Sequence, residues 1–289
     1  MSENKNMDAA LERAKAKAEA MKAKADAAKK EAPKKANPFA VEPNEYTHVK
    51  HVIGIVSGKG GVGKSTVTCA LAVELNRQGY SVGILDADIT GPSIPRMLGV
   101  QGIYGMQGEL IIPGESETGI RVISMNLLLE GEDQAMIWRG PAIAGVVKQF
   151  WSDVVWGDLD YLLVDMPPGT GDVPLTVFQS LPVDGILLVT SPQSLVEMIV
   201  KKAYNMAEKM DIPILGIIEN YSYVACPDCG RKIEVFGKSR IEGFAAECGI
   251  PVCAKLPLDG EIAALADAGR MEMIPAGFLA DALPAMPKA

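Results

Sequence analysis

The pattern of hydrophobic and polar residues changes at about Val49. From there on, short apolar runs alternate with segments whose apolar residues recur at helical spacing. Short, nearly continuous apolar runs are typical of strands buried on both faces of a parallel sheet. The expected strands are 51–57, 81–87, 161–166, 185–190, 214–220 and 251–256, and the expected helices are 64–78, 141–154, 194–209, 239–248 and 259–268. The alternation predicts an α/β fold with a doubly wound, mostly parallel sheet.

Two stretches depart from this alternation. Residues 101–123 carry Gly and Pro between "ELIIP" and "IRVISM", which indicates a small hairpin insertion. Residues 1–36 are rich in Ala and Lys and contain almost no large apolar side chains. Such a segment has too little apolar surface to form a core, so it is predicted to be a flexible or partly helical arm. We therefore expect an arm over residues 1–40 and a single domain over residues 41–289.

Composition and charge narrow the functional class. The chain has 289 residues, 48% of them hydrophobic, which is enough for one large domain. Its net charge of −8 argues against a general nucleic-acid binder. No apolar run is long enough to span a membrane, and the N-terminus lacks the apolar stretch of a signal peptide. These features predict a cytoplasmic protein without nucleic-acid or membrane partners, whose five cysteines are reduced.

The strongest motif is "SGKGGVGKST", which follows the first expected strand and opens the first expected helix. It matches G-x-x-x-x-G-K-[ST], the P-loop, in the strand–loop–helix context that this motif requires. Its glycines allow backbone N–H groups to surround a phosphate at the positive end of a helix. The predicted nucleotide-binding residues of the loop are Gly58, Lys59, Gly60, Gly61, Val62, Gly63, Lys64, Ser65 and Thr66. Lys64 is expected to reach the outer phosphates of ATP, and Ser65 to hold Mg²⁺.

Lys59 is a second lysine within the same loop. At the start of the loop it is poorly placed for the outer phosphates of its own nucleotide. It is better placed to reach a nucleotide that faces it across a dimer interface. We therefore predict a catalytic role for Lys59 and a homodimer. The form K-G-G-x-G-K-[ST] resembles the deviant P-loop of the MinD-like ATPases.

Polar residues at the ends of three other strands complete the predicted site. The carboxyl ends of parallel strands line the ligand crevice of such folds. Asp165, in "LLVDMPPGTGD", is the expected partner of a Mg²⁺-bound water, and the following Pro-Pro-Gly-Thr-Gly loop is placed to sense the γ-phosphate. Asp88, which follows Asp86 in "LDADITGPS", is the candidate that orients the attacking water. Asn220 is placed to pair with an adenine edge.

The pair Cys226 and Cys229, in "CPDCG", supports three interpretations. A thioredoxin-type redox pair should open a helix, but Gly230 follows at once and the preceding "NYSYVA" resembles a loop. A zinc site completed by Cys248 and Cys253 has a plausible spacing. However, Cys248 ends an expected helix and Cys253 lies within an expected strand, where a thiol usually acts as a small hydrophobic group.

The third interpretation is a knuckle whose two thiolates point outward. Gly230 would leave backbone N–H groups free to stabilise the thiolates. Two such knuckles around a two-fold axis supply four thiolates, which suits zinc or an iron–sulfur cluster. The dimer expected from Lys59 would satisfy this ligand count as well.

Five segments taken together resemble one family. "GKGGVGKST", "DADITGPSIPRMLG", "IWRGP", "WGDLDYLLVDMPPGTGD" and "IIENYSYVACPDCG" are similar to the Mrp/ApbC family of P-loop iron–sulfur cluster carriers, along a match from about Val49 to Asp267. The resemblance implies a homodimeric ATPase that binds a bridging [4Fe–4S] cluster, receives it from a donor and transfers it to apo-proteins. By position it places the cluster ligands on Cys226 and Cys229 and the signature lysine on Lys59. The domain 41–289 would then be a MinD-like ATPase domain with slow, switch-like turnover.

The chain also departs from the family. It lacks an N-terminal four-cysteine cluster and a small N-terminal domain, has Tyr221 where methionine is expected, and ends in an atypical C-terminal segment. Two other functions are compatible with parts of the pattern. A nucleotide-dependent electron-transfer reductase would carry separate cysteines on loops. A MinD- or ParA-like positioning ATPase would need a basic C-terminal helix or a basic surface.

Overall fold

The computed structural model describes residues 39–89, 91–128, 140–169, 171–193 and 196–289. The chain divides between Pro38 and Phe39, and these described residues form the second of the two units. Residues 1–38 of the predicted arm and the "IWRGP" segment up to Arg139 therefore lie outside the described residues. None of the described helices is both long and apolar enough to cross a membrane.

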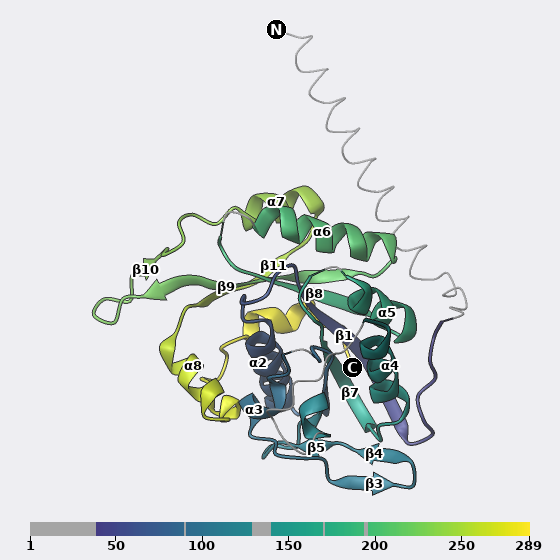
Figure 1. The fold of residues 1–289 in the computed structure, drawn as a ribbon. Helices are drawn as coiled ribbons and strands as arrows, with labels where there is room; N and C mark the ends of the chain where they lie inside the picture. The colour runs from purple at the N-terminus through teal and green to yellow at the C-terminus, as the bar shows by residue number, and fades with distance from the viewer. Residues whose placement is uncertain (1–38, 90, 129–139, 170, 194–195) are drawn as a thin grey trace, which may run out of the picture. The chain divides into compact units, whose positions relative to one another are not determined.

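The described elements alternate between strands and helices along most of the chain (Figure 1). The strands are β1 (Thr47–Ser57), β2 (Val82–Asp86), β3 (Gly105–Gln107), β4 (Leu110–Ile112), β5 (Gly114–Glu115), β6 (Arg121–Ile123), β7 (Gly157–Asp165), β8 (Gly185–Thr190), β9 (Ile214–Ala225), β10 (Lys232–Ile233) and β11 (Val252–Pro257). The α-helices are α2 (Lys64–Arg77), α3 (Ile94–Leu98), α4 (Gly140–Ser152), α5 (Asp172–Ser180), α6 (Val196–Lys209), α7 (Ile241–Cys248) and α8 (Gly260–Asp267). Short 3-10 turns are η1 (Met125–Leu127), η2 (Met271–Met273) and η3 (Ala280–Ala285).

The main sheet confirms the predicted doubly wound architecture. Its strand order is β10-β9-β8-β1-β7-β2-β6-β5, and β11 also pairs with β9. The six strands predicted from the sequence all pair in parallel, whereas β5 and β10 are antiparallel additions. The register places Asp165 of β7 beside Ile55 of β1 on one side and beside Asp86 of β2 on the other. The carboxyl ends of the central strands therefore meet at one edge.

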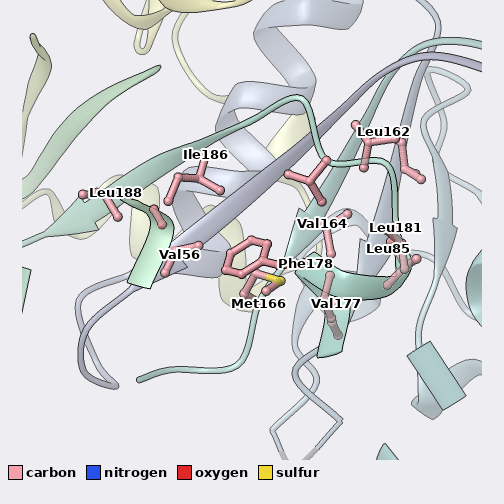
Figure 2. Close-up of a cluster of buried hydrophobic side chains, with 14 of the residues drawn as sticks. Val56, Leu85, Leu162, Val164, Met166, Val177, Phe178, Leu181, Ile186 and Leu188 are labelled. Atoms are coloured by element: carbon pink, nitrogen blue, oxygen red, sulfur yellow. The ribbon is translucent and has the colours of Figure 1, made fainter. Parts of the chain in front are cut away.

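Two hydrophobic cores cover the two faces of the sheet. Successive residues of β1 alternate between them: Val52 and Val56 enter one core, and Ile53 and Ile55 enter the other. Helices α4, α5, α6 and α7 pack on the first face, while α2, α3 and α8 pack on the second. Figure 2 shows part of the first core, in which strand residues such as Val164 and Leu188 surround Phe178 of α5. This packing on both faces explains why the strands are almost continuously apolar.

Two predictions need correction. The hairpin insertion is confirmed, but it is formed by β3 and β4 alone. Residues of "IRVISM" belong instead to β6, which extends the main sheet as a parallel neighbour of β2. The segment "NYSYVA" is not a loop, because β9 continues through it to Ala225. A strand of this length carries the chain past the edge of the core and directly into Cys226.

Candidate phosphate and cysteine sites

The P-loop joins β1 to α2. Two of its glycines have backbone conformations that other residues rarely adopt. Gly61 and Gly63 have φ angles of 77° and 76°, in the left-handed region that favours glycine. A Cβ on Gly63 would also overlap the side chains of Asn220 and Tyr221. Helix α2 starts at Lys64, so its first N–H groups face the loop. The loop therefore has the conformation that a phosphate cradle requires.

Lys64 forms the centre of a buried polar network at the end of β7. Its ammonium lies 2.6 Å from Oδ2 of Asp165, and both side chains are buried. Ser65 Oγ donates to the same carboxylate oxygen at 2.6 Å, and Thr68 Oγ1 donates to Oδ1 at 2.6 Å. The structure thus brings together residues from two motifs that were predicted separately: Lys64 and Ser65 of the P-loop, and Asp165 at the end of β7. Thr68 is an addition that the motif did not reveal, one helical turn after Lys64 on the same face of α2.

Asp86 is the main polar residue to which the sequence analysis gave no role. It is buried beside Asp165 in the sheet register, and its carboxylate accepts a hydrogen bond from Ser124 Oγ at 3.0 Å. Burial, followed by the negative charge of Asp165, raises the pKa of Asp86 to about 8, against the lowering effect of Lys64. The "DAD" pattern at the end of the strand was the only feature of the sequence that could have indicated a role for Asp86. Only the pairing of β2 with β7 shows that the first of its two aspartates faces Asp165.

Asp88 lies at the mouth of the same site and is half-buried. Its backbone N–H donates to Oδ1 of Asp86 at 3.1 Å, so the buried carboxylate fixes the loop that carries it. Asp88 lines one cavity together with the P-loop residues Gly60, Gly61, Gly63, Lys64, Ser65 and Thr66. Ser57 lines this cavity as well, and its buried hydroxyl has no hydrogen-bond partner among the described residues. Cationic, hydroxyl and carboxylate groups around a glycine-rich loop fit the phosphates of a nucleotide and a Mg²⁺ ion.

The remaining predicted residues contact their own chain. Lys59 Nζ donates to the side-chain oxygen of Gln193, just after β8. Asn220 is buried, and its amide donates to the carbonyl of Val62 at 3.0 Å while its oxygen accepts the N–H of Tyr221. Asn220 therefore ties the P-loop to β9. Each end of an amide can make a second hydrogen bond, so the adenine contact stays a prediction.

The two cysteines lie on a projecting ribbon, which we call the cysteine arm and define as residues 223–236. β10 pairs with the far end of β9, and the turn between them is closed by hydrogen bonds from Cys226 N–H to the carbonyl of Arg231 and from Gly230 N–H to the carbonyl of Cys226. Gly230 closes the turn with its own N–H, while the N–H groups of Asp228 and Cys229 lie within hydrogen-bond reach of the Cys226 thiol, in keeping with the expectation that the turn leaves backbone N–H groups for a thiolate. The backbone N–H groups of Cys229 and Asp228, together with the Cys229 thiol, lower the pKa of Cys226. A lowered thiol pKa favours the thiolate, the form that binds metal.

The other cysteines do not complete a site with this pair. Cys248 ends α7, Cys253 lies in β11, and Cys69 is buried in α2. Burial raises the pKa of all three, which disfavours their thiolates. Throughout the described ranges, no group of three or more His, Cys, Asp or Glu side chains is arranged to hold a metal ion. Within that part of the chain the cysteine arm thus offers two thiols and no third ligand.

The sequence was compared with models of known protein families. The model described as "ParA: NUBPL iron-transfer P-loop NTPase" matches residues 48–281. The chain belongs to this family. Among its relatives, an iron-sulfur cluster carrier protein of Clostridium perfringens is 48% identical over 235 residues, 78% of this chain and 82% of the relative. One of the same description from Methanocaldococcus jannaschii is 49% identical over 223 residues, covering 76% of this chain and 77% of the relative. The sequence resemblance to P-loop iron–sulfur cluster carriers is confirmed.

Solved structures support both family and fold. A nucleotide-binding protein from Archaeoglobus fulgidus, solved in complex with ADP, is 40% identical, with a TM-score of 0.72, and covers 83% of this chain and 93% of its own. A chain of the MinC–MinD cell division protein complex of Aquifex aeolicus is 21% identical with a TM-score of 0.59, over 83% of this chain and 97% of its own. At that level of identity the likeness shows the shared fold alone.

Proposed function

We propose that this protein binds and hydrolyses ATP with Mg²⁺, holds a bridging [4Fe–4S] cluster as a homodimer, and transfers that cluster to apo-proteins. The main support for this proposal is the cysteine arm. The cysteine arm presents two thiols, one with a lowered pKa, on a family member with a complete P-loop, and the described residues supply no third ligand. A [4Fe–4S] cluster is normally held by four thiolates. A second copy of Cys226 and Cys229 would supply the other two.

The nucleotide roles follow from the network around Asp165. Lys64 is held by Asp165 at 2.6 Å, so its ammonium would exchange this carboxylate for the outer phosphates when a nucleotide binds. Ser65 would then be free to ligate Mg²⁺, with Asp165 on a water of the ion. Mg²⁺ supplies charge neutralisation of the phosphates. Asp88, fixed by Asp86, would orient the attacking water, and Asn220 would contact the adenine.

Lys59 and β9 give this ATPase its link to the cluster. Lys59 would leave Gln193 and reach the nucleotide of the partner subunit. Within β9 (Ile214–Ala225), Asn220 donates to the carbonyl of Val62 in the P-loop, and the strand ends at the residue before Cys226. Between these points Tyr221 has a φ of 58°, an unusual conformation for a bulky residue. A change in the P-loop therefore has a short backbone route to the cysteine pair, which supports nucleotide-controlled cluster release. Slow turnover stays an expectation from the family resemblance.

Anaerobic reconstitution of the full chain tests the proposal. Shared ligation predicts about two irons per chain and a dimeric mass, because four irons are divided between two chains. Absorption spectroscopy and sulfide analysis identify the cluster. A tagged heterodimer that combines a wild-type chain with a chain carrying Cys226→Ser and Cys229→Ser should lose the cluster. Four irons on a monomer, or a cluster retained by that heterodimer, would contradict shared ligation.

Transfer is tested separately. The reconstituted protein should convert an apo-ferredoxin to its [4Fe–4S] form, and the rate should change when Mg-ATP is added. A reconstituted protein that keeps its cluster in the presence of the acceptor, with and without Mg-ATP, would contradict the carrier role. It would then favour an electron-transfer role for the same cluster.

A further inference from the structure

The cysteine arm is unusually exposed for a two-stranded ribbon. Residues 227–238 are all exposed, and Figure 1 shows β10 and the end of β9 extending away from the helices that cover the sheet. Two-stranded ribbons without packing are at best marginally stable in water. The arm is therefore expected to gain stability from a surface that packs against it.

The arm also carries apolar side chains in this exposed position. Ile233 is 49% exposed, Val235 55% and Phe236 40%. Leu258, at 41% exposure, lies beside the arm because its N–H donates to the carbonyl of Tyr223 at 2.7 Å. Four large apolar side chains on and beside the arm that carries half-buried Cys226 and exposed Cys229 are more than the single scattered hydrophobic residue that is normal on a surface.

We propose that Ile233, Val235, Phe236 and Leu258 form the surface on which a second copy of this chain packs around the shared cysteines. This inference rests on the proposed function, because the missing thiolates are what identify the partner. In an isologous dimer the same patch of both copies meets at the two-fold axis. An axis that brings two Cys226–Cys229 pairs together must also bring together the residues next to them. The apolar residues are thus placed to exclude water from the cluster.

The surface is not flat at this point. Phe236 forms part of the wall of a cavity of about 230 Å³, together with Pro192, Ile241 and Phe244. Other walls of this recess carry polar and charged residues, among them Glu219, Lys238 and Arg240, so only its apolar part beside Phe236 suits an apolar side chain from a neighbouring subunit. Phe236 therefore connects the exposed arm to a shaped pocket in the body of the domain.

Charge makes this contact dependent on the cluster. Between Cys226 and Arg240 the chain carries four basic residues, Arg231, Lys232, Lys238 and Arg240, and two acidic residues, Asp228 and Glu234. Two such arms repel one another, and part of the positive charge stays close to the ribbon because Lys232 lies 4.2 Å from the centroid of the Tyr223 ring. Four thiolates around a cluster supply compensating negative charge. The arms should therefore associate weakly without the cluster and firmly with it.

The test compares Val235→Asp and Ile233→Asp with Met106→Asp. All three replace an exposed apolar residue: Ile233 lies in β10, Val235 in the turn that follows β10, and Met106, which is 56% exposed, in β3 of the β3–β4 hairpin. Each variant keeps all the cysteines and should remain folded, because exposed substitutions usually change stability by less than about 0.5 kcal/mol. Circular dichroism of the full chain checks this. The dimer dissociation constant and the iron content per chain are then measured after anaerobic reconstitution.

We expect Val235→Asp and Ile233→Asp to weaken the dimer at least about tenfold, since each buries an unpaired charge in both copies, and to lower iron per chain in parallel. Met106→Asp should match the wild type. A folded Val235→Asp variant with wild-type dimer mass and iron would overturn the inference. If that variant instead lost only transfer to apo-ferredoxin, the surface would belong to the acceptor and not to a second copy. A wild-type protein that binds no cluster, or binds it as a monomer, would contradict the proposed function itself.

Discussion

The phosphate site and the cysteine arm differ in how much of each site one chain supplies. Around Asp165, side chains from α2 donate hydrogen bonds to its carboxylate. Asp86 of β2, beside it, accepts a hydrogen bond from the backbone of Asp88. Around Cys226, the described chain provides backbone hydrogen bonds and exposed apolar residues but only half of a ligand set. The first site is preorganised by one fold, whereas the second requires another molecule. One chain therefore supplies the whole buried network around Asp165, whereas cluster binding needs a second chain.

The largest expected effect is on the incomplete site. Cys226→Ser or Cys229→Ser should remove all bound cluster, because each change deletes two of the four ligands in the dimer. Nucleotide binding should persist, since the contact between β9 and the P-loop is made by Asn220 and not by either cysteine. Iron analysis after reconstitution and calorimetric titration with Mg-ADP measure the two effects.

Cys248→Ser and Cys253→Ser are the matched controls for this change. Both thiols lie in core elements with a raised pKa, so neither substitution should lower iron content. Cys253→Ser should cost some stability, because its half-buried thiol would be replaced by a more polar group. A requirement for either residue in metal binding would mean that one chain completes the site, and the contrast between the two regions would be lost.

The next effect concerns the complete site. Lys64→Ala should lower the hydrolysis rate by about 100- to 1,000-fold, as expected for the loss of a group that stabilises developing charge. It should also lower the free energy of unfolding by about 3–5 kcal/mol, because Asp165 would remain buried without its cation. Lys50→Ala removes an exposed ion pair with Asp160 and should cost at most about 1 kcal/mol. Equal effects of the two substitutions would contradict the central position of Lys64.

Two glycine substitutions separate the stability cost of a steric overlap from the cost of an unfavourable backbone conformation. Gly61 and Gly63 have nearly the same φ, but a Cβ would meet atoms within 4 Å only at Gly63. Gly61→Ala should therefore cost about 1 kcal/mol of stability through strain alone. Gly63→Ala should cost more and weaken Mg-ADP binding, because it pushes Asn220 away from Val62. Denaturant unfolding and ADP titration compare them, and a smaller loss for Gly63→Ala would contradict the Asn220 contact.

The smallest effect on function is expected from Asp86→Asn. This substitution tests whether the buried Asp86 is protonated in the folded protein. The pKa of Asp86 is raised from 3.8 to about 8 in the folded protein. Between these values the unfolded chain loses its proton while the folded chain keeps it, so this residue destabilises the fold increasingly as pH rises from about 4 to 8. Asp86→Asn removes that term. Its stability relative to the wild type should rise over this pH range, by an amount on the order of a few kcal/mol near pH 8. A difference that is constant from pH 4 to 8 would show that Asp86 is ionised in both states.

The sequence determined the parts of this protein that depend on local geometry. A run of glycines before Lys64 and Ser65 specifies a phosphate loop because so few residues adopt φ angles such as those of Gly61 and Gly63. Apolar runs of five or six residues fixed the central strands, since only burial on both faces favours them. The spacing of Cys226 and Cys229 specified a turn that presents two thiols. These features were predicted correctly because each involves neighbours along the chain.

The tertiary structure decided what depends on strand order and register. Asp86 meets Asp165 only because β2 pairs with β7, although 79 positions separate them in the sequence. Asn220 holds Val62, 158 positions away, for the same kind of reason. β6 joined the main sheet because β2 had a free edge, and β9 extended into the arm because β10 and β11 pair with its far end. Periodicity records which residues are buried but not which strand lies beside which, so these contacts could not be predicted from the sequence.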